Sequence, residues 1–332
     1  MAEFGKMVYY DLADLKERLG HVEMRWFVRE SESDFLRMAN DVADRAAWNP
    51  DIKAIFISGP SSSGKTTFAN RLAGALHLHG RSTVSLHLDD YYREKRTGKD
   101  ALGRPDFESI DTLSIDLIVE HIDKLLHYGE VNVPSYDFVT RKRSFDPRKK
   151  LTMEPRGILL VEGLHGLSKE IEQGINPANC LKVFIMPYAT LTANRCLLDS
   201  RDIRILRRVS RDHFKRGTNP FSTIDYWPML DASEEVVFPE YLARADVFIN
   251  SAMPYEFFVI APLAAGLIEQ ELADYREGKI KQSIYMSNGK LYADLSYTVK
   301  KATELVASTR DIPCVSPDVV PAISILNEFL GK

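Results

Sequence analysis

Short apolar runs alternate with stretches of helical periodicity through the middle of the chain. The apolar runs cover residues 54–58, 83–88, 157–161, 181–185 and 246–249, and each is too short for a buried helix. Helical patterns occupy residues 65–79, 115–126 and 201–217. Short buried strands that alternate with helices are typical of βαβ units. The pattern therefore predicts an α/β fold with a doubly wound parallel sheet.

The two ends of the chain have a different pattern. Residues 1–50 carry apolar side chains at helical spacing behind a Ser33-Asp34 cap, and this pattern stops at Asn49-Pro50. The sequence becomes helical again just after Pro262. We therefore divide the chain into an N-terminal helical leader (1–50), a core (51–261) and a C-terminal helical extension (262–332).

Composition and charge narrow the class of protein. Of the 332 residues, 45% are hydrophobic and 27% are charged, as in ordinary globular proteins. With 43 Lys and Arg against 47 Asp and Glu, the chain lacks the basic surplus of a dedicated nucleic-acid binder. Its three cysteines form no CxxC pair, and no apolar run has the length of a membrane span. We expect a cytoplasmic protein with small-molecule partners and with neither nucleic-acid nor membrane partners.

A glycine-rich motif follows the first strand of the core. Residues 59–67 read GPSSSGKTT and match the GxxxxGK[ST] pattern in full, between an apolar strand and a helix. In this motif backbone N–H groups turn onto phosphate oxygens, Lys65 reaches the β and γ phosphates, and Thr66 offers its hydroxyl to Mg²⁺. The predicted ATP-binding residues of the loop are Gly59, Ser61, Ser62, Ser63, Gly64, Lys65, Thr66 and Thr67.

Other parts of the chain limit the kind of nucleotide enzyme. No Asn-Lys-x-Asp sequence, which a GTPase would need to read guanine, follows a later strand. The strand at 157–161 leads into Glu162-Gly163, whereas motor ATPases normally end such a strand in Asp-Glu. A small-molecule kinase remains, with either ATP or GTP as the phosphate donor.

Acidic residues follow two strands, at the sheet edge where open parallel sheets bind their ligands. Asp89 can orient an acceptor hydroxyl and take its proton, and Glu162 is expected beside the metal. The predicted metal set is Thr66, Glu162 and Asp89, and the predicted catalytic pair is Asp89 and Lys65. The alternative is that Asp89 only caps the following segment and that Glu162 is a solvated strand end.

Arginines crowd the helical stretch at 201–217. Arg204, Arg207, Arg208 and Arg211 fall at three- and four-residue steps, so they share a face that can clamp a triphosphate. We expect a mobile lid whose like charges repel one another until phosphates arrive, against the ordinary alternative of a solvated charged face.

Six motifs occur in one order between residues 52 and 250. They are GPSSSGKTT (59–67), LDDYY (88–92), PDFE (105–108), VPSYDF (133–138), VEG (161–163) and RILRRVSRD (204–212). Together they resemble the uridine kinase and phosphoribulokinase group of P-loop kinases, and within it the uridine–cytidine kinases. The resemblance implies a P-loop kinase fold, phosphotransfer to an alcohol, ATP as donor and Mg²⁺ as cofactor. It also implies a homo-oligomer as one option, because family members often assemble.

The resemblance also implies roles on the acceptor side. Asp89 would be the general base for a ribose 5′-hydroxyl, and Glu108 stands where the family has a ribose-binding Asp. Arg141 stands where the family has a pyrimidine-reading His. Arginine only donates hydrogen bonds, so the amino group of cytosine would lose its acceptor. The implied substrate-binding residues are Tyr92, Phe107, Glu108, Tyr136, Phe138, Arg141 and Arg204.

The activity expected from the sequence is ATP- and Mg²⁺-dependent phosphorylation of a nucleoside, with uridine as the first candidate, at its 5′-hydroxyl. Two alternatives stay open. In one, the kinase acts on a sugar, a sugar phosphate or another polyol, with Arg141, Lys142 and Arg143 as an anion clamp. In the other, the protein is a nucleotide-binding regulator without turnover.

Overall fold

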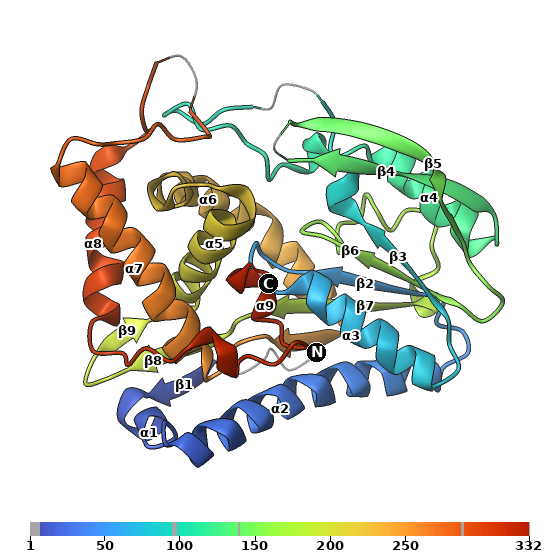
Figure 1. The fold of residues 1–332 in the computed structure, drawn as a ribbon. Helices are drawn as coiled ribbons and strands as arrows, with labels where there is room; N and C mark the ends of the chain where they lie inside the picture. The colour runs from blue at the N-terminus through green and yellow to red at the C-terminus, as the bar shows by residue number, and fades with distance from the viewer. Residues whose placement is uncertain (1–6, 95–97, 139, 287–288, 332) are drawn as a thin grey trace.

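A parallel sheet lies at the centre of the computed structural model, which describes residues 7–94, 98–138, 140–286 and 289–331 (Figure 1). The strands have the order β10-β7-β2-β6-β3, and every neighbouring pair is parallel. They are β2 (Ala54–Ser58), β3 (Thr83–His87), β6 (Ile158–Glu162), β7 (Cys180–Met186) and β10 (Val247–Asn250). The sheet confirms the predicted fold class.

Hydrophobic cores cover both faces of this sheet. Ile55 and Ile57 of β2 belong to one core, whereas Ala54 and Phe56 belong to the other, because successive strand residues point to opposite faces. The first core includes residues of α2 (His21–Ala47) and α3 (Lys65–Leu78), and the second includes residues of α4 (Ile115–Leu126). Burial on both faces explains why β2 and β6 are apolar up to their last residues, Ser58 and Glu162.

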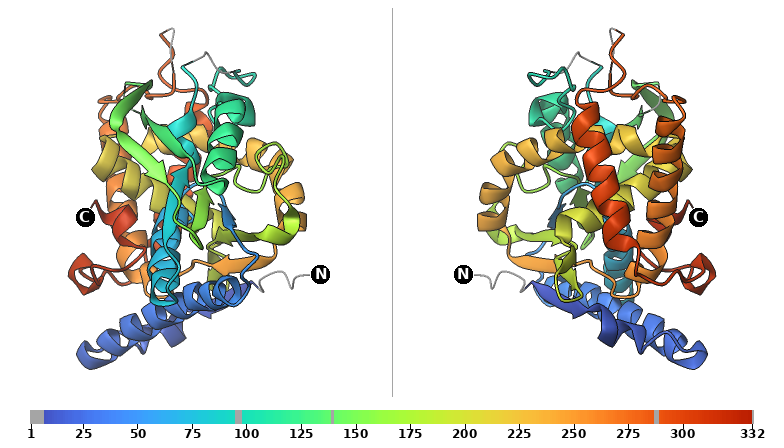
Figure 2. Two further views of the ribbon diagram at one scale, coloured as in Figure 1. Left: turned by 90° about the vertical axis from the view of Figure 1, so that its right-hand side faces the viewer. Right: turned by 90° about the vertical axis from the view of Figure 1, so that its left-hand side faces the viewer.

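Four further helices form the part of the molecule beside the sheet (Figures 1 and 2). They are α5 (Ser200–Arg216), α6 (Pro220–Arg244), α7 (Glu256–Arg276) and α8 (Leu295–Thr309). The short α9 (Asn327–Leu330) lies against α5. A long hairpin, β4 (Glu130–Asp137) with β5 (Lys142–Thr152), stands on the opposite side of the molecule (Figure 1).

The remaining elements are small. β1 (Val8–Asp11), β8 (Ala189–Thr192) and β9 (Cys196–Leu198) form a second sheet, which the sequence did not predict, and α1 (Leu12–Lys16) follows β1. The 3₁₀ helices are η1 (Leu88–Tyr91), η2 (Ile110–Thr112), η3 (Pro177–Asn179) and η4 (Pro317–Val319). Within the described ranges, no helix has the length and apolar character that crossing a bilayer requires.

Two predicted helix starts are wrong. The N-terminal helix begins at His21, so Ser33-Asp34 lies inside α2 and caps nothing. Likewise α7 begins at Glu256 and runs through Pro262. Proline removes the hydrogen bond that the carbonyl of Phe258 would receive, but the backbone N–H of Val315 donates to that carbonyl at 2.8 Å. The division of the chain into leader, core and extension stays a prediction, and α7 crosses its second boundary.

The order of the strands places a ligand site beyond the end of β2. The chain runs from β2 to β3 on one side and later crosses from β6 to β7 on the other side of β2, so the direction of winding reverses there. Open α/β sheets bind ligands in the crevice at such a switch point, outside the carboxyl ends of the strands. The register also sets His87 of β3 beside Glu162 of β6 at this edge.

The arginines of α5 do not form the exposed, mutually repelling lid that the sequence predicted. Arg204, Arg207 and Arg208 are each at most 5% exposed. Arg204 pairs with Glu234 of α6, and Arg207 donates to both carboxylate oxygens of Glu256 at 2.6 and 2.8 Å. Acids far away in the sequence thus neutralise Arg204 and Arg207, Asp212 on the same helix pairs with Arg208 and Arg211, and α5 is a packed helix.

We expect Arg207→Met to lower the free energy of unfolding by about 3–5 kcal/mol, because Glu256 would keep its charge in a buried site. The double variant with Glu256→Leu should regain part of this loss, since no unpaired charge remains. Lys215→Met, at the exposed end of the same helix, should change stability by less than about 0.5 kcal/mol. Urea denaturation measures all three, and equal values for Arg207→Met and Lys215→Met would contradict the structural role.

Candidate active site

A cavity of about 580 Å³ opens beyond the carboxyl ends of β2, β3 and β6. Residues of the phosphate loop, of η1, of the hairpin, of α5 and of the segment 284–286 line it. The structure therefore brings together most of the residues that the sequence singled out, although they come from widely separated segments.

The phosphate loop lines the cavity with Ser61, Ser62, Gly64, Lys65 and Thr66. Ser62 and Gly64 both have left-handed backbone conformations, with φ of 61° and 86°. This turn leads directly into α3 at Lys65, so the helix N-terminus faces the cavity and favours an anion there. The Lys65 ammonium donates to the carbonyl oxygens of Gly59 and Pro60, each at 2.9 Å.

Three predicted loop residues do not line the cavity: Gly59, Ser63 and Thr67. Gly59 has a packing reason for being glycine, because a Cβ there would overlap the carbonyl oxygen of Ile185. These residues form the base of the loop rather than its inner surface.

An acidic cluster lies beside the loop. The Thr66 hydroxyl donates to Oε1 of Glu162 at 3.0 Å, and Nδ1 of His87 lies 2.7 Å from the same oxygen. Burial alone would raise the pKa of Glu162, but the hydrogen bond from His87 and the charge of Lys65 lower it. In return, the hydrogen bond to Glu162 raises the pKa of His87. Glu162 is therefore held as a carboxylate.

Asp89 borders the cavity and is accessible from it. Neighbouring protein atoms partly desolvate this carboxyl and so raise its pKa, and the nearby charge of Glu162 raises it further. Its neighbour Asp90 has a different role, since it accepts hydrogen bonds from the N–H of Tyr136 and from Lys149. Of the Asp-Asp pair, only Asp89 lines the cavity.

The residues beside the loop fit a magnesium ion. The described chain contains no group of three or more His, Cys, Asp or Glu side chains that could hold a metal alone. Magnesium in phosphoryl-transfer enzymes needs only one or two protein oxygens, because water and substrate phosphates complete its shell. Thr66 and Glu162 supply such hard oxygen ligands, and Asp89 adds a third near them.

Aromatic rings line a large part of the same cavity. Tyr92, Tyr136 and Phe138 form a trio with ring centroids 5.1 to 5.6 Å apart. Phe107 lines the same cavity beside Glu108, whose pKa burial raises although the charge of Arg208 opposes this. The predicted nucleoside-holding residues thus share one cavity.

The basic triplet of residues 141–143 does not converge on this cavity. Only Arg141 lines it, with its guanidinium 4.7 Å from the ring centroid of Phe107 and a hydrogen bond of 3.4 Å to the carbonyl of Ile284. Arg143 points elsewhere, because its Nη1 donates to Ser114 at 2.6 Å. Lys142 is exposed and lies outside the cavity lining.

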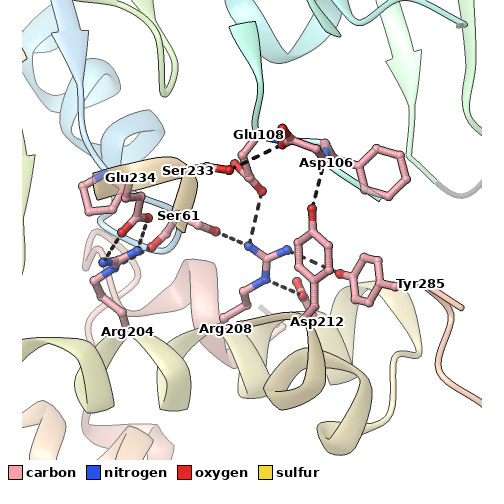
Figure 3. A network of polar contacts seen from close by, with 12 residues as sticks. Ser61, Asp106, Glu108, Arg204, Arg208, Asp212, Ser233, Glu234 and Tyr285 are labelled. Carbon is pink, nitrogen blue, oxygen red and sulfur yellow. Dashed lines mark hydrogen bonds and ion pairs between the residues drawn. The ribbon is translucent and has the colours of Figure 1, made fainter. Parts of the chain in front are cut away.

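The arginines of α5 divide into two groups. Arg208 and Arg211 line the cavity, as the sequence predicted for phosphate-binding residues. Arg204 and Arg207 do not, so the structure gives no support to their predicted contacts with triphosphate or substrate. They hold the loop from behind instead: Arg204 donates to the Ser61 carbonyl at 3.2 Å, and Arg207 to the Ser62 carbonyl at 3.3 Å. Figure 3 shows Arg204 turned toward Glu234, and Arg208 between Glu108 and Asp212.

Several lining residues were missed by sequence reasoning. They are Leu164, Thr218, Tyr226, Ile284, Tyr285, Met286 and Glu328, whereas Arg216, which also lines the cavity, was expected as part of the Arg-rich lid. All of them lie outside the six motifs, and no spacing rule links them to the phosphate loop. Tyr226 gave a weak signal only, because tyrosines in helical stretches are usually part of the core. Tyr285 lies in a turn between α7 and α8.

The comparison with known proteins agrees with this geometry. The model of the phosphoribulokinase/uridine kinase family matches residues 54–256. The chain belongs to this family. Family membership confirms the predicted resemblance, the P-loop kinase fold, and a phosphotransferase that acts on an alcohol group.

Individual relatives cover about half of the chain. A uridine kinase from Anoxybacillus flavithermus is 29% identical over 174 residues, which are 52% of this chain and 73% of that protein. A uridine kinase from Borreliella burgdorferi is 29% identical over 175 residues, 53% of this chain and 74% of that protein. The solved structure of a possible uridine kinase from Bacillus stearothermophilus is 20% identical, with a TM-score of 0.38, and covers 60% of this chain and 88% of that one.

We expect kcat/KM for the acceptor to fall as the pH drops through the pKa of Asp89, because only the carboxylate can take a proton. Since the site raises this pKa above the ordinary 3.8, the fall should begin at a higher pH than an exposed aspartate would give. A pH–rate profile at saturating ATP measures it, with circular dichroism at each pH as the control for unfolding. A flat profile down to about pH 4 in folded protein would contradict the assignment.

Proposed function

We propose that this kinase uses ATP and Mg²⁺ to phosphorylate a nucleoside, with uridine as the first candidate, at the 5′-hydroxyl. The observation that carries the proposal is one cavity lined by the phosphate loop, by Asp89 and by six aromatic rings. The rings belong to Tyr92, Phe107, Tyr136, Phe138, Tyr226 and Tyr285. The names of the two curated relatives support the same acceptor class.

The chemistry of the lining favours a nucleoside over a sugar phosphate. A nucleoside presents a flat aromatic face, which pairs well with aromatic rings, and a ribose whose hydroxyls can bond to Glu108. A sugar phosphate would bring a further anion among Asp89, Glu108 and Glu162, with only Arg141 of the basic triplet in the lining. The anion-clamp alternative therefore loses its main support.

The residues of the cavity can carry out the transfer in line. Asp89 orients the acceptor hydroxyl and takes its proton, which needs the carboxylate form. Lys65, Arg208 and Arg211 balance the negative charge of the donor phosphates. Thr66 and Glu162 would hold Mg²⁺, which would supply positive charge to neutralise the donor phosphates. A regulator without turnover would need no base at Asp89, and nothing else in the cavity favours that alternative.

The direct test is a panel of acceptors. We expect ADP release with uridine to exceed that with ribose or ribose 5-phosphate, and Asp89→Asn to lower kcat by at least ~10²-fold with the KM for ATP nearly unchanged. Asp90→Asn is the matched control and should keep kcat, because asparagine can still accept the hydrogen bond from Tyr136. Turnover of ribose 5-phosphate alone would refute the nucleoside assignment while leaving the kinase in place.

A second prediction concerns the base. The guanidinium of Arg141 can donate to the O4 oxygen of uracil but meets the donor amino group of cytosine, so uridine should be preferred over cytidine by about 1–3 kcal/mol. Arg141→His should narrow this gap by restoring an acceptor, whereas Lys142→His, outside the cavity, should leave it unchanged. The ratio of kcat/KM for the two nucleosides measures the effect. A gap that persists in Arg141→His would show that another residue reads the base.

A further inference from the structure

A segment of the C-terminal extension lines the acceptor cavity. Ile284, Tyr285 and Met286 are part of the lining, although they lie beyond residues 54–256, which the family model matches. This wall therefore lies outside the part of the chain that the family model matches. We propose that Tyr285 is a specificity-determining and positioning residue: its ring forms a wall for the nucleoside base, and its hydroxyl positions Arg208. The inference rests on the proposed function.

The ring of Tyr285 is fixed on one side by other rings. It stacks on Tyr226 with a centroid distance of 4.2 Å and an interplanar angle of 18°, and the centroid of Phe107 lies 6.4 Å away. Tyr226 is itself held, since its hydroxyl donates to the carbonyl of Pro105 at 3.0 Å. A stacked, braced ring has little rotamer freedom left to lose, so it can present a rigid flat surface to a planar ligand.

The segment is also fastened to the hairpin. The guanidinium of Arg141, which packs on the ring of Phe107, donates to the backbone carbonyl of Ile284. Arg141, which stands at the family's base-reading position, thus contacts Ile284, the residue before Tyr285. Base recognition by Arg141 and wall formation by Tyr285 therefore occur in the same part of the cavity.

The hydroxyl of Tyr285 reaches the charged centre of the site. Nη2 of Arg208 lies 3.4 Å from this hydroxyl, while Nη1 donates to the Ser61 hydroxyl at 2.8 Å and lies 3.9 Å from Glu108 (Figure 3). Arg208 thus connects the phosphate loop, the acceptor carboxylate and the extension. Through it, Tyr285 affects how the donor phosphates are held relative to the acceptor hydroxyl.

The chain contains a close control for this contact. Tyr297, in the same extension, has its hydroxyl 3.4 Å from Nη2 of Arg201, on the same helix α5. Neither Tyr297 nor Arg201 lines the acceptor cavity. Substitutions of Tyr297 therefore remove a tyrosine–arginine contact between the C-terminal extension and α5, as substitutions of Tyr285 do, but at a place outside the cavity.

The experiment compares Tyr285→Phe and Tyr285→Leu with Tyr297→Phe and Tyr297→Leu in the full chain. Tyr285→Leu loses both the ring and the hydroxyl, so it should raise the KM for uridine about 3- to 10-fold in addition to the fall in kcat expected for Tyr285→Phe. For ribose, which has no base to stack, kcat/KM should fall only as much as in Tyr285→Phe. Tyr285→Phe should keep the KM for uridine and lower kcat about 3- to 10-fold, because only the positioning of Arg208 is lost. Both Tyr297 variants should match the wild type, and thermal melting confirms that each variant is folded.

The outcomes separate this inference from the proposed function. Equal losses for uridine and ribose in Tyr285→Leu, or kinetics identical to the Tyr297 variants, would overturn the role of Tyr285 while the wild type still phosphorylates uridine. If the wild type phosphorylates only ribose, the proposed function fails, and the role of Tyr285 as a wall for a base fails with it. In that case kcat of Tyr285→Phe with ribose still tests whether Tyr285 positions Arg208. Isothermal titration of uridine onto wild type and Tyr285→Leu measures the wall independently of turnover, and equal affinities would overturn it.

Discussion

The shape of the phosphate loop depends on guanidinium groups that hold it from outside the cavity. Arg204 and Arg207 of α5 bond the carbonyls of Ser61 and Ser62. Since the C=O and the N–H of a planar trans peptide point in opposite directions, each carbonyl held toward α5 turns the next N–H away from it. Loop amides are thereby available for anions before any ligand arrives.

This arrangement makes the nucleotide site dependent on acids that never touch a nucleotide. Arg204 and Arg207 keep their positions because Glu234 of α6 and Glu256 of α7 neutralise them in the protein interior. Buried charges are costly unless paired and fully hydrogen-bonded, so the four side chains form one unit. The C-terminal segment adds to it: Phe329 packs on the guanidinium of Arg207, and a Cβ at Gly64 would overlap Ile325.

The sequence was informative where structure is local. The strands and the glycine-rich loop follow from short runs of residues, because backbone conformation and burial on both faces constrain each position independently. Arg204 and Arg207 of α5 were recognised but misjudged, since their partners lie 30 and 49 residues away and no local rule pairs them. Tyr285 lies in a turn-rich segment whose place beside Tyr226 follows only from the packing of α6, α7 and α8. Local rules place a helix start just after Pro262. In this fold α7 begins earlier, at Glu256, and continues through the proline.

The helix that passes through Pro262 has a further consequence for how the molecule opens. Its continuity depends on a hydrogen bond from Val315, so α7 and the loop that carries Val315 cannot separate without exposing an unsatisfied carbonyl at Phe258. Segments that share such a bond tend to unfold together as one cooperative unit. Glu256, the partner of Arg207, stands at the first turn of α7, so opening of the loop that carries Val315 is expected to loosen the arginine that shapes the phosphate loop.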